Sequence, residues 1–147
     1  MSQQVLIFEI LSISNSDKWE VAKTEWSLFE VYDQEIPSTC LCNHFPIKEI
    51  CVIRNDANGN KAVVGNCCVK RFLDIQSDKI FSSIKRVRKD YCKSLNLDSV
   101  QYAFNKKWIS TWERDFYLDI KLKRKLSSKQ LKKKQEINTT ISNMLKK

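Results

Sequence analysis

The order of hydrophobic and polar residues predicts a different kind of element in each part of the chain. Val5–Ile13 is dominated by β-branched and aromatic residues and is followed by a serine-rich segment, so we expect a strand there. In Asp17–Glu30, hydrophobic residues recur three or four positions apart, which is the spacing of one helix face. This second segment is expected to be a helix with its apolar side in the core, formed by Trp19, Ala22, Trp26 and Phe29.

The middle of the chain has the pattern of a β-hairpin followed by a helix. Ile50–Arg54 and Ala62–Val64 are short β-prone runs, and Asn55–Asn60 between them contains an Asn-Gly pair. Asn-Gly supplies the positive-φ positions that tight hairpin turns require. The next segment, Cys67–Leu73, is expected to form a short helix.

Helical patterns fill the remaining third of the chain. A helix is expected to begin after a capping serine, Ser77, and to continue to about Lys93. Two further helices each begin with a capping box, in which a serine and a Glu or Gln three residues later satisfy each other's backbone amides. These boxes are Ser110 with Glu113 and Ser127 with Gln130.

Cysteine and histidine residues lie on both sides of the predicted hairpin. Cys40, Cys42 and His44 occupy alternate positions, so an extended segment would project all three to one side. Cys67 or Cys68 would complete the set from the first turn of the following helix, where unpaired amides and the helix dipole stabilise a thiolate. Four nitrogen and sulfur ligands make a closed, tetrahedral structural zinc site. We expect Cys40, Cys42, His44 and Cys68 to bind Zn²⁺, with Cys68 preferred because it lies further into the helix.

Two other interpretations of these residues remain open. Free cysteines are commonly buried and a single histidine can be a hydrogen-bonded core residue, so the group could be ordinary buried thiols. The residues could also bind a different metal ion. A usual treble-clef zinc finger has Cys-x-x-Cys at both ends, whereas this chain has Cys-x-Cys-x-His and an adjacent cysteine pair. Cys51 and Cys92 are expected to be core thiols.

Three stretches of this region form a longer pattern: Cys40–Ile47, Ile53–Asn55 and Val64–Phe72. They read Cys-x-Cys-x-His-x-Pro-Ile, Ile-x-Asn and Val-Gly-Asn-x-Cys-Val-x-Arg-Phe. With this pattern the chain resembles a group of small uncharacterised phage and bacterial proteins with a treble-clef-like zinc-binding motif. The resemblance implies that Cys68 is the cysteine of the motif's second half, and it implies a mobile-element context.

Together the elements predict an α+β fold. A small zinc-bound, treble-clef-like hairpin module would be flanked by an N-terminal helix and a helical C-terminal half. Residues 1–75 would contain the N-terminal helix and the zinc module, and residues 76–147 would form a basic helical region packed with them as one unit.

The composition is that of a folded chain. Among its 147 residues, 42% are hydrophobic and only two are glycine and two proline, which favours helices over loop-rich folds. No apolar stretch reaches the roughly 18 residues of a membrane span, and the first residues lack the basic start and cleavage site of a signal peptide. We therefore expect a cytoplasmic protein with no membrane partner, whose six cysteines stay reduced.

Charge is distributed unevenly along the chain, which has a net charge of +9. Residues 1–40 contain two lysines and seven acidic residues, a net charge of −5. Residues 119–147 contain ten basic and two acidic residues, a net charge of +8. Polyanions would therefore be attracted to the C-terminal part of the chain.

The basic segments predict contact with nucleic acid, DNA or RNA, through the phosphate backbone. Lysine outnumbers arginine there, which indicates little sequence preference because bidentate base contacts are made mainly by arginine. A solvated surface and an acidic protein partner are the alternatives. The predicted nucleic-acid-binding residues are Lys85, Arg86, Lys89, Lys121, Lys123, Arg124, Lys125, Lys129, Lys132, Lys133 and Lys134.

No enzyme motif accompanies these features. With a single histidine there is no Ser-His-Asp arrangement, and neither of the two glycines belongs to a phosphate-binding loop. We therefore expect a non-enzymatic protein without a small-molecule substrate. The leading hypothesis is a zinc-stabilised nucleic-acid-binding protein of phage or mobile-element type. The alternative is a protein-interaction module that inhibits or regulates a host nucleoprotein complex.

Overall fold

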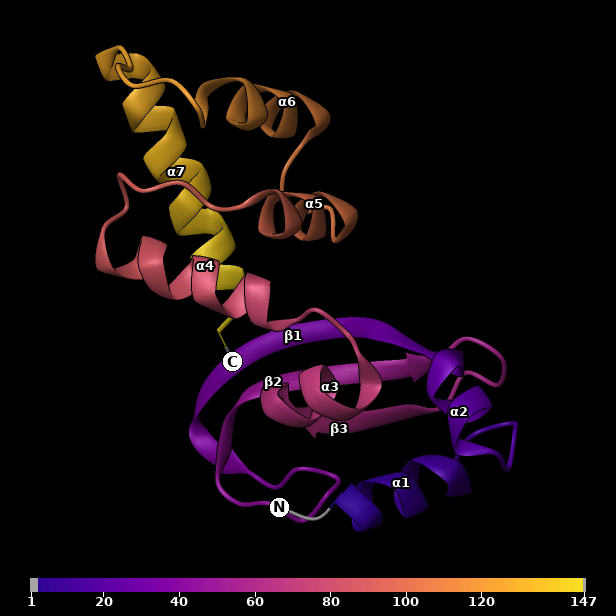
Figure 1. The fold of residues 1–147 in the computed structure, drawn as a ribbon. Coiled ribbons are helices and arrows are strands. Elements are labelled where there is room, and N and C mark those ends of the chain that lie inside the picture. Colours follow the sequence, from indigo (N-terminus) through magenta and orange to yellow (C-terminus); the bar gives the residue numbers. More distant parts are fainter. Residues whose placement is uncertain (1–2, 147) are drawn as a thin grey trace. The chain divides into compact units, whose positions relative to one another are not determined.

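The structure, a computed structural model, describes residues 3–146 and divides the chain into two compact units (Figure 1). The first unit extends to Asp78, and the second runs from Lys79 to Lys146. Over the described residues, the chain forms one three-stranded antiparallel sheet and seven α-helices. The α+β class expected from the sequence is therefore confirmed. None of the helices in residues 3–146 combines the length and the apolarity needed to cross a bilayer.

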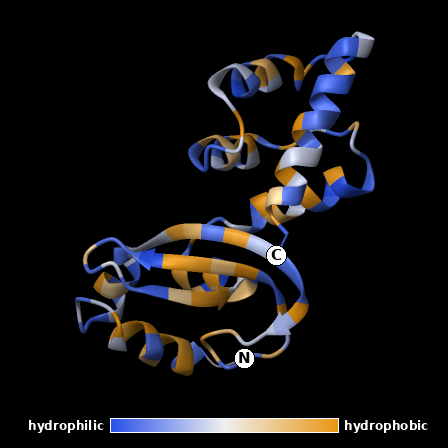
Figure 2. Cartoon of the chain, turned by 180° about the vertical axis from the view of Figure 1, so that it is seen from behind, coloured by the Kyte–Doolittle hydropathy of each residue, from blue (hydrophilic) through white to orange (hydrophobic). Residues whose placement is uncertain are grey.

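The sheet of the first unit consists of β1 (Trp26–Ser38), β2 (Ile47–Asn55) and β3 (Lys61–Gly65), in that order. The central strand β2 pairs antiparallel with both neighbours, so that Cys51 lies between Val31 of β1 and Val64 of β3. All three of these side chains are buried, and Figure 2 shows β2 to be largely hydrophobic. The predicted β2–β3 hairpin is confirmed.

Helix α3 (Asn66–Leu73) follows β3 without a linker and packs against β2 and β3. It buries Cys68, Val69 and Leu73, whereas Cys67 is exposed. This helix was expected from the sequence. It ends at Leu73, and the next residue, Asp74, adopts the left-handed conformation that often terminates helices.

The first residues that the structure describes form a helix, α1 (Gln3–Ser12), and the expectation of a strand over Val5–Ile13 is wrong. Leu6 and Ile10, four residues apart, are fully buried, while Phe8 is 69% exposed. Burial in this segment therefore follows the helical period and not the alternation of a strand. β propensity depends strongly on context, and here the packing of one helical face prevails over it.

The helix expected over Asp17–Glu30 is also mostly wrong. Only Trp19–Ala22 forms an α-helix, α2, and it passes into a short 3₁₀ turn, Lys23–Glu25. From Trp26 the chain is extended, because this segment pairs antiparallel with β2. The first pair is Trp26 with Asn55, the last residue of β2. A strand partner so distant in sequence cannot be recognised from local hydrophobic spacing.

Glu25 joins three parts of the first unit through its carboxylate. One oxygen accepts hydrogen bonds from the backbone amide of Asn15, at 2.7 Å, and from the side-chain amide of Asn55, at 2.8 Å. The other oxygen accepts from the amide of Ser16 at 2.9 Å. The bonds from Asn55, Asn15 and Ser16 favour the charged form and lower the pKa of Glu25 below its usual value.

Replacement of Glu25 by Gln should destabilise the protein in a pH-dependent way. A carboxyl group whose pKa is lowered by folding contributes stability above its unfolded pKa and loses that contribution as the pH falls through its folded pKa. Urea midpoints of Glu25→Gln should be lower than those of the wild type at pH 7, and the difference should shrink below the ordinary pKa of about 4.5. A constant difference across this range would contradict the assigned hydrogen bonds.

The second unit is helical. Its elements are α4 (Asp78–Lys89), α5 (Leu97–Asn105), α6 (Thr111–Ile120) and α7 (Ser128–Met144). Both predicted capping boxes are present, at the start of α6 and at the start of α7. Here the sequence signal is local and needs no tertiary partner, so it is reliable.

The expected helix from Ser77 to about Lys93 is shorter in the structure, since α4 ends at Lys89. The hydroxyl of Ser77 donates a hydrogen bond to the side-chain oxygen of Asn66, at 2.5 Å.

Helix α5 was not expected. Its start nevertheless has a local signal, because the Asn96 side chain accepts a hydrogen bond from the amide of Ser99, as an N-cap residue does.

A buried tyrosine holds three segments of the second unit together. The hydroxyl of Tyr117 in α6 donates to the side-chain oxygen of Asn138 in α7, at 2.6 Å, and accepts from the amide of Leu95, at 2.7 Å. The side-chain amide of Asn138 donates to the carbonyl groups of Tyr91 and Lys93. Burial raises the pKa of Tyr117 to about 12, so the hydroxyl keeps its proton. Every polar group of this network therefore has a partner.

Replacement of Tyr117 by Phe should lower the free energy of unfolding by roughly 1–3 kcal/mol, because it leaves the Leu95 amide and the Asn138 oxygen buried without partners. Denaturant unfolding measures this loss. In the double variant Tyr117→Phe/Asn138→Ala, the loss should be smaller than the sum of the two single losses, since both residues belong to one network. Unchanged stability of Tyr117→Phe would contradict this role.

Candidate metal centre

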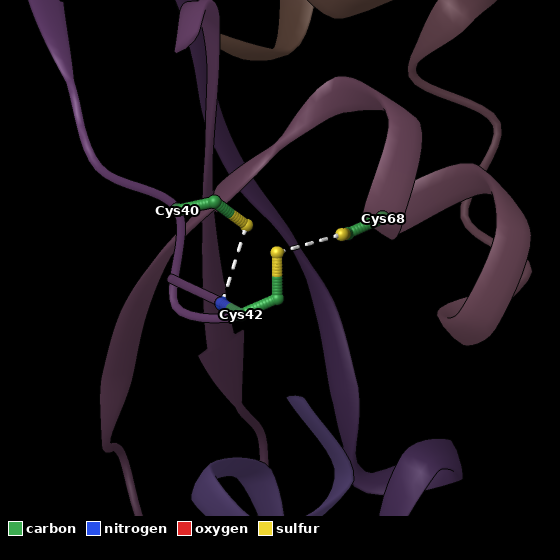
Figure 3. Close-up of side chains that lie close together, drawn as sticks. All are labelled: Cys40, Cys42 and Cys68. Carbon is green, nitrogen blue, oxygen red and sulfur yellow. Dashed lines mark hydrogen bonds between the residues drawn. The ribbon is translucent and has the colours of Figure 1, made fainter. Parts of the chain in front are cut away.

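Three buried cysteines of the first unit form a compact group of thiols (Figure 3). The Sγ atoms of Cys40, Cys42 and Cys68 all lie within 4.8 Å of one another, and those of Cys42 and Cys68 are 3.5 Å apart. Zinc–sulfur bonds of ~2.3 Å in a tetrahedron separate neighbouring sulfurs by about 3.8 Å. The three thiols therefore have a spacing at which one metal ion could bind all of them.

The segment that carries the first two cysteines is a tight turn. The carbonyl group of Cys40 accepts a hydrogen bond from the amide of Asn43, at 2.8 Å, and the amide of Cys40 donates to the carbonyl group of His44, at 2.9 Å. Asn43 has a φ of 71°, which asparagine adopts more readily than most residues. The expectation of an extended segment projecting Cys40, Cys42 and His44 to one side is therefore wrong.

Backbone amides are directed at the sulfur of Cys40. The amide of Gly65 donates to it at 3.2 Å, and the amide of Cys42 donates at 3.5 Å. Gly65 is the residue just before α3, and a Cβ atom there would lie 3.2 Å from Ile47 and 3.8 Å from the same sulfur. A side chain at this position would therefore crowd Ile47, whereas its contact with the sulfur would be an ordinary van der Waals contact.

A further backbone bond fixes the turn on the sheet. The amide of Leu41 donates to the carbonyl group of Val63 in β3, at 3.1 Å. The turn is thereby attached to the strand that leads directly into α3, which carries Cys68. Sequence analysis missed both Gly65 and Leu41 as parts of the site. The signal for Gly65 was its place directly before the predicted helix, where one of only two glycines in the chain occurs.

Two of the thiols, Cys40 and Cys68, differ in how strongly they hold a proton. A hydrogen bond with Cys68 lowers the pKa of Cys40 to about 5, against the effect of burial and with help from the amides of Gly65 and Cys42. The same hydrogen bond, together with burial, raises the pKa of Cys68. Of this pair, Cys40 therefore ionises first, and Cys68 retains the proton between them. A metal cation would take the place of such a proton, since it also neutralises buried thiolates.

His44 is exposed and does not belong to the thiol group. It lines a cavity of about 560 Å³ together with Cys40, Cys67 and Cys68. The structure thus brings together three of the four residues expected to bind zinc and places His44 at the cavity beside them. Because His44 is exposed, it is not the hydrogen-bonded core histidine of the buried-thiol interpretation.

The remaining cysteines differ in their surroundings. Cys51 is fully buried in β2, and burial raises its pKa to about 12, so it stays a thiol. Cys92 is exposed in the turn after α4, so its expected place in a helix and in the core is wrong. Its sulfur accepts a hydrogen bond from the side-chain amide of Gln135, at 3.2 Å.

The predicted nucleic-acid-binding residues all lie in the second unit, and several already have partners there. Lys123 pairs with Asp119 at 3.6 Å, and Lys133 pairs with Glu113 at 3.2 Å. Arg86 donates to the carbonyl group of Ser94. Lys134 is 6% exposed, so it is not part of an open basic surface.

Other members of this set keep their charge uncompensated. In the part of the chain that the structure describes, no carboxylate forms an ion pair with Lys89, Lys121, Arg124, Lys125, Lys129 or Lys132. All but the partly buried Lys121 are exposed. Five of them continue from the end of α6 into α7, whose first half Figure 2 shows to be largely hydrophilic.

The chain was also compared with known proteins. No protein-family model matches it, and no curated protein or solved structure is significantly similar to it.

Proposed function

We propose that this protein is a small, zinc-stabilised and non-enzymatic nucleic-acid-binding protein. The observation that carries the proposal is the set of uncompensated cations between α6 and the first turns of α7, namely Lys121, Arg124, Lys125, Lys129 and Lys132. The metal centre would have a structural role in the first unit. The second unit would bind the phosphate backbone of DNA or RNA.

Zinc is the metal that best fits the thiol group. Soft thiolate ligands select zinc, copper(I) or iron–sulfur clusters, and three sulfurs with a nearby imidazole are a common zinc-binding set. A tetrahedral site needs a fourth ligand, and His44 at the cavity beside Cys40 and Cys68 is the first choice. Cys67 lines the same cavity and is the second choice.

A treble-clef-like arrangement is part of the proposal. The cysteine turn, the β2–β3 hairpin and the first turn of α3 follow one another in the order that such zinc fingers have. In this arrangement the metal would connect the turn to the helix. All three thiols are at least 98% buried, which favours a structural role over catalysis, because a catalytic metal keeps a position open for a substrate.

Nucleic-acid binding is supported by charge and by one aromatic side chain. Cations that lack carboxylate partners release condensed counterions when they contact phosphates, and this release drives binding. Trp112 in α6 is 62% exposed and stacks on Phe116, and the Nζ atom of Lys133 lies 5.7 Å from its ring. An exposed indole beside lysines can stack on an unpaired base, which favours single-stranded ligands.

The metal centre can be tested by replacing one of two adjacent cysteines. Purified wild-type protein should contain about one zinc per chain by elemental analysis. Cys68→Ser should lose the zinc and unfold at a lower temperature, because metal binding contributes to folding free energy. Cys92→Ser is the control, since Cys92 is exposed and lies outside both the thiol group and the cavity beside it, and this variant should retain zinc.

His44→Ala distinguishes the candidates for the fourth ligand. If His44 binds the metal, this variant should need a lower chelator concentration to release zinc, whereas Cys67→Ser should behave like the wild type. A wild-type protein that is folded and free of metal when purified without chelators would contradict the zinc centre.

Binding to random-sequence DNA and RNA oligonucleotides tests the second half of the proposal. Affinity should be measurable at low salt and fall steeply as salt increases. A quadruple variant with Lys121, Lys123, Arg124 and Lys125 replaced by Gln should lose most of this affinity. A control with Lys18, Arg54, Lys61 and Lys107 replaced by Gln removes the same number of positive charges and should keep it.

No binding at low salt would contradict nucleic-acid binding. A salt-insensitive complex with a host nucleoprotein component, formed without nucleic acid, would instead support the alternative function of a protein-interaction module.

A further inference from the structure

The second unit contains a cavity of about 360 Å³ whose lining is strongly basic. The lining comes from three segments: the turn after α4, the loop between α6 and α7, and α7 itself. Five of its residues are cationic: Lys93, Lys121, Lys123, Arg124 and Lys134. No carboxylate from the described residues lines it.

Lys134 is the unusual member of this group. It is 6% exposed, and within residues 3–146 it has no ion-pair or hydrogen-bond partner. Burial lowers its pKa, because the charged ammonium group loses solvation. A buried cation is costly unless an anion or several hydrogen-bond acceptors compensate it. This lysine therefore has a charge that a ligand in the cavity could compensate.

The nearest acidic groups leave the cavity without a counterion. Asp90 is exposed, and its carboxylate accepts a hydrogen bond from the amide of Cys92, at 2.9 Å. The Cys92 thiol, which lines the cavity, and Asp90 act on Lys134 only as more distant charges, and neither forms an ion pair with it. Asp119 pairs with Lys123, at 3.6 Å, and does not line the cavity.

We propose that this cavity binds a phosphate group of the nucleic-acid ligand, with Lys134 at its base and Lys121 and Arg124 among the cations around it. The proposal rests on the proposed nucleic-acid-binding function and names the point at which the ligand is anchored. A phosphate offers several oxygens to cations that approach from different sides, and a guanidinium group can bind two of them. Its source is either an internal phosphodiester or a terminal phosphomonoester.

A matched pair of variants on one helix tests the proposal. Lys134→Met removes the buried charge and keeps an unbranched apolar side chain, while Lys132→Met removes an exposed charge that does not line the cavity. Oligonucleotide affinity should fall about tenfold or more in Lys134→Met, as expected for a charge-assisted contact, and only about twofold in Lys132→Met. Thermal unfolding without ligand should show that Lys134→Met is at least as stable as the wild type, since a desolvated charge has been removed.

Two further measurements show which kind of phosphate binds and whether the cavity binds phosphate by itself. The first measurement compares oligonucleotides with and without a 5′-phosphate. Tighter binding of the phosphorylated oligonucleotide indicates a terminal phosphate. Equal affinity for both, with the same loss of affinity in Lys134→Met, indicates an internal phosphate. Inorganic phosphate should raise the unfolding temperature of the wild type relative to chloride at equal ionic strength, and should not raise that of Lys134→Met.

The outcomes distinguish failure of the cavity from failure of nucleic-acid binding. Equal affinity losses in Lys134→Met and Lys132→Met, or a phosphate-induced stabilisation that Lys134→Met retains, would overturn the cavity while leaving nucleic-acid binding intact. Stabilisation by inorganic phosphate that depends on Lys134, without any oligonucleotide binding, would support the cavity as a phosphate site and overturn the proposed function.

Discussion

The sulfur of Cys40 is the point on which the first unit depends. It receives hydrogen bonds from the amides of Cys42 and Gly65, one from its own turn and one from the end of β3. A hydrogen bond between the two thiols links it to Cys68 of α3, and this bond lowers the pKa of Cys40 and raises that of Cys68. The turn, the hairpin and the helix therefore meet at one atom. Three buried thiols in such a place concentrate negative charge as they ionise, and a cation compensates that charge better than a shared proton does.

The sequence could predict the parts of this arrangement that are local. The β2–β3 hairpin follows from two β-prone runs around an Asn-Gly turn, and Gly59 there has a φ of 79°. The capping boxes of α6 and α7 are equally local. The choice of Cys68 over Cys67 agrees with its burial on the inner face of α3. Each of these features needs only residues that are close in the chain.

The features that were missed depend on distant partners. Trp26 begins a strand because Asn55, 29 residues later, is its partner in β2, and no helical spacing in Asp17–Glu30 can indicate this. The compact turn at Cys40 likewise depends on β3, which accepts the Leu41 amide and supplies the Gly65 amide. His44 differs from the cysteines because the chain turns at Asn43, so the alternation of an extended segment does not continue to His44.

The second unit resolves the problem of buried polar groups in two different ways. Around Tyr117, each buried donor and acceptor has a protein partner, so the network is stable by itself. Lys134 is buried only four residues before Asn138 on the same helix, yet it has no ion pair or hydrogen bond within residues 3–146, and only the more distant charges of Cys92 and Asp90 act on it. A buried charge without a partner destabilises the fold, and titratable groups in such surroundings occur mainly at functional sites. Since the other side chains at its cavity include four cations and no carboxylate among the described residues, the missing partner is best explained as an anion from outside the chain.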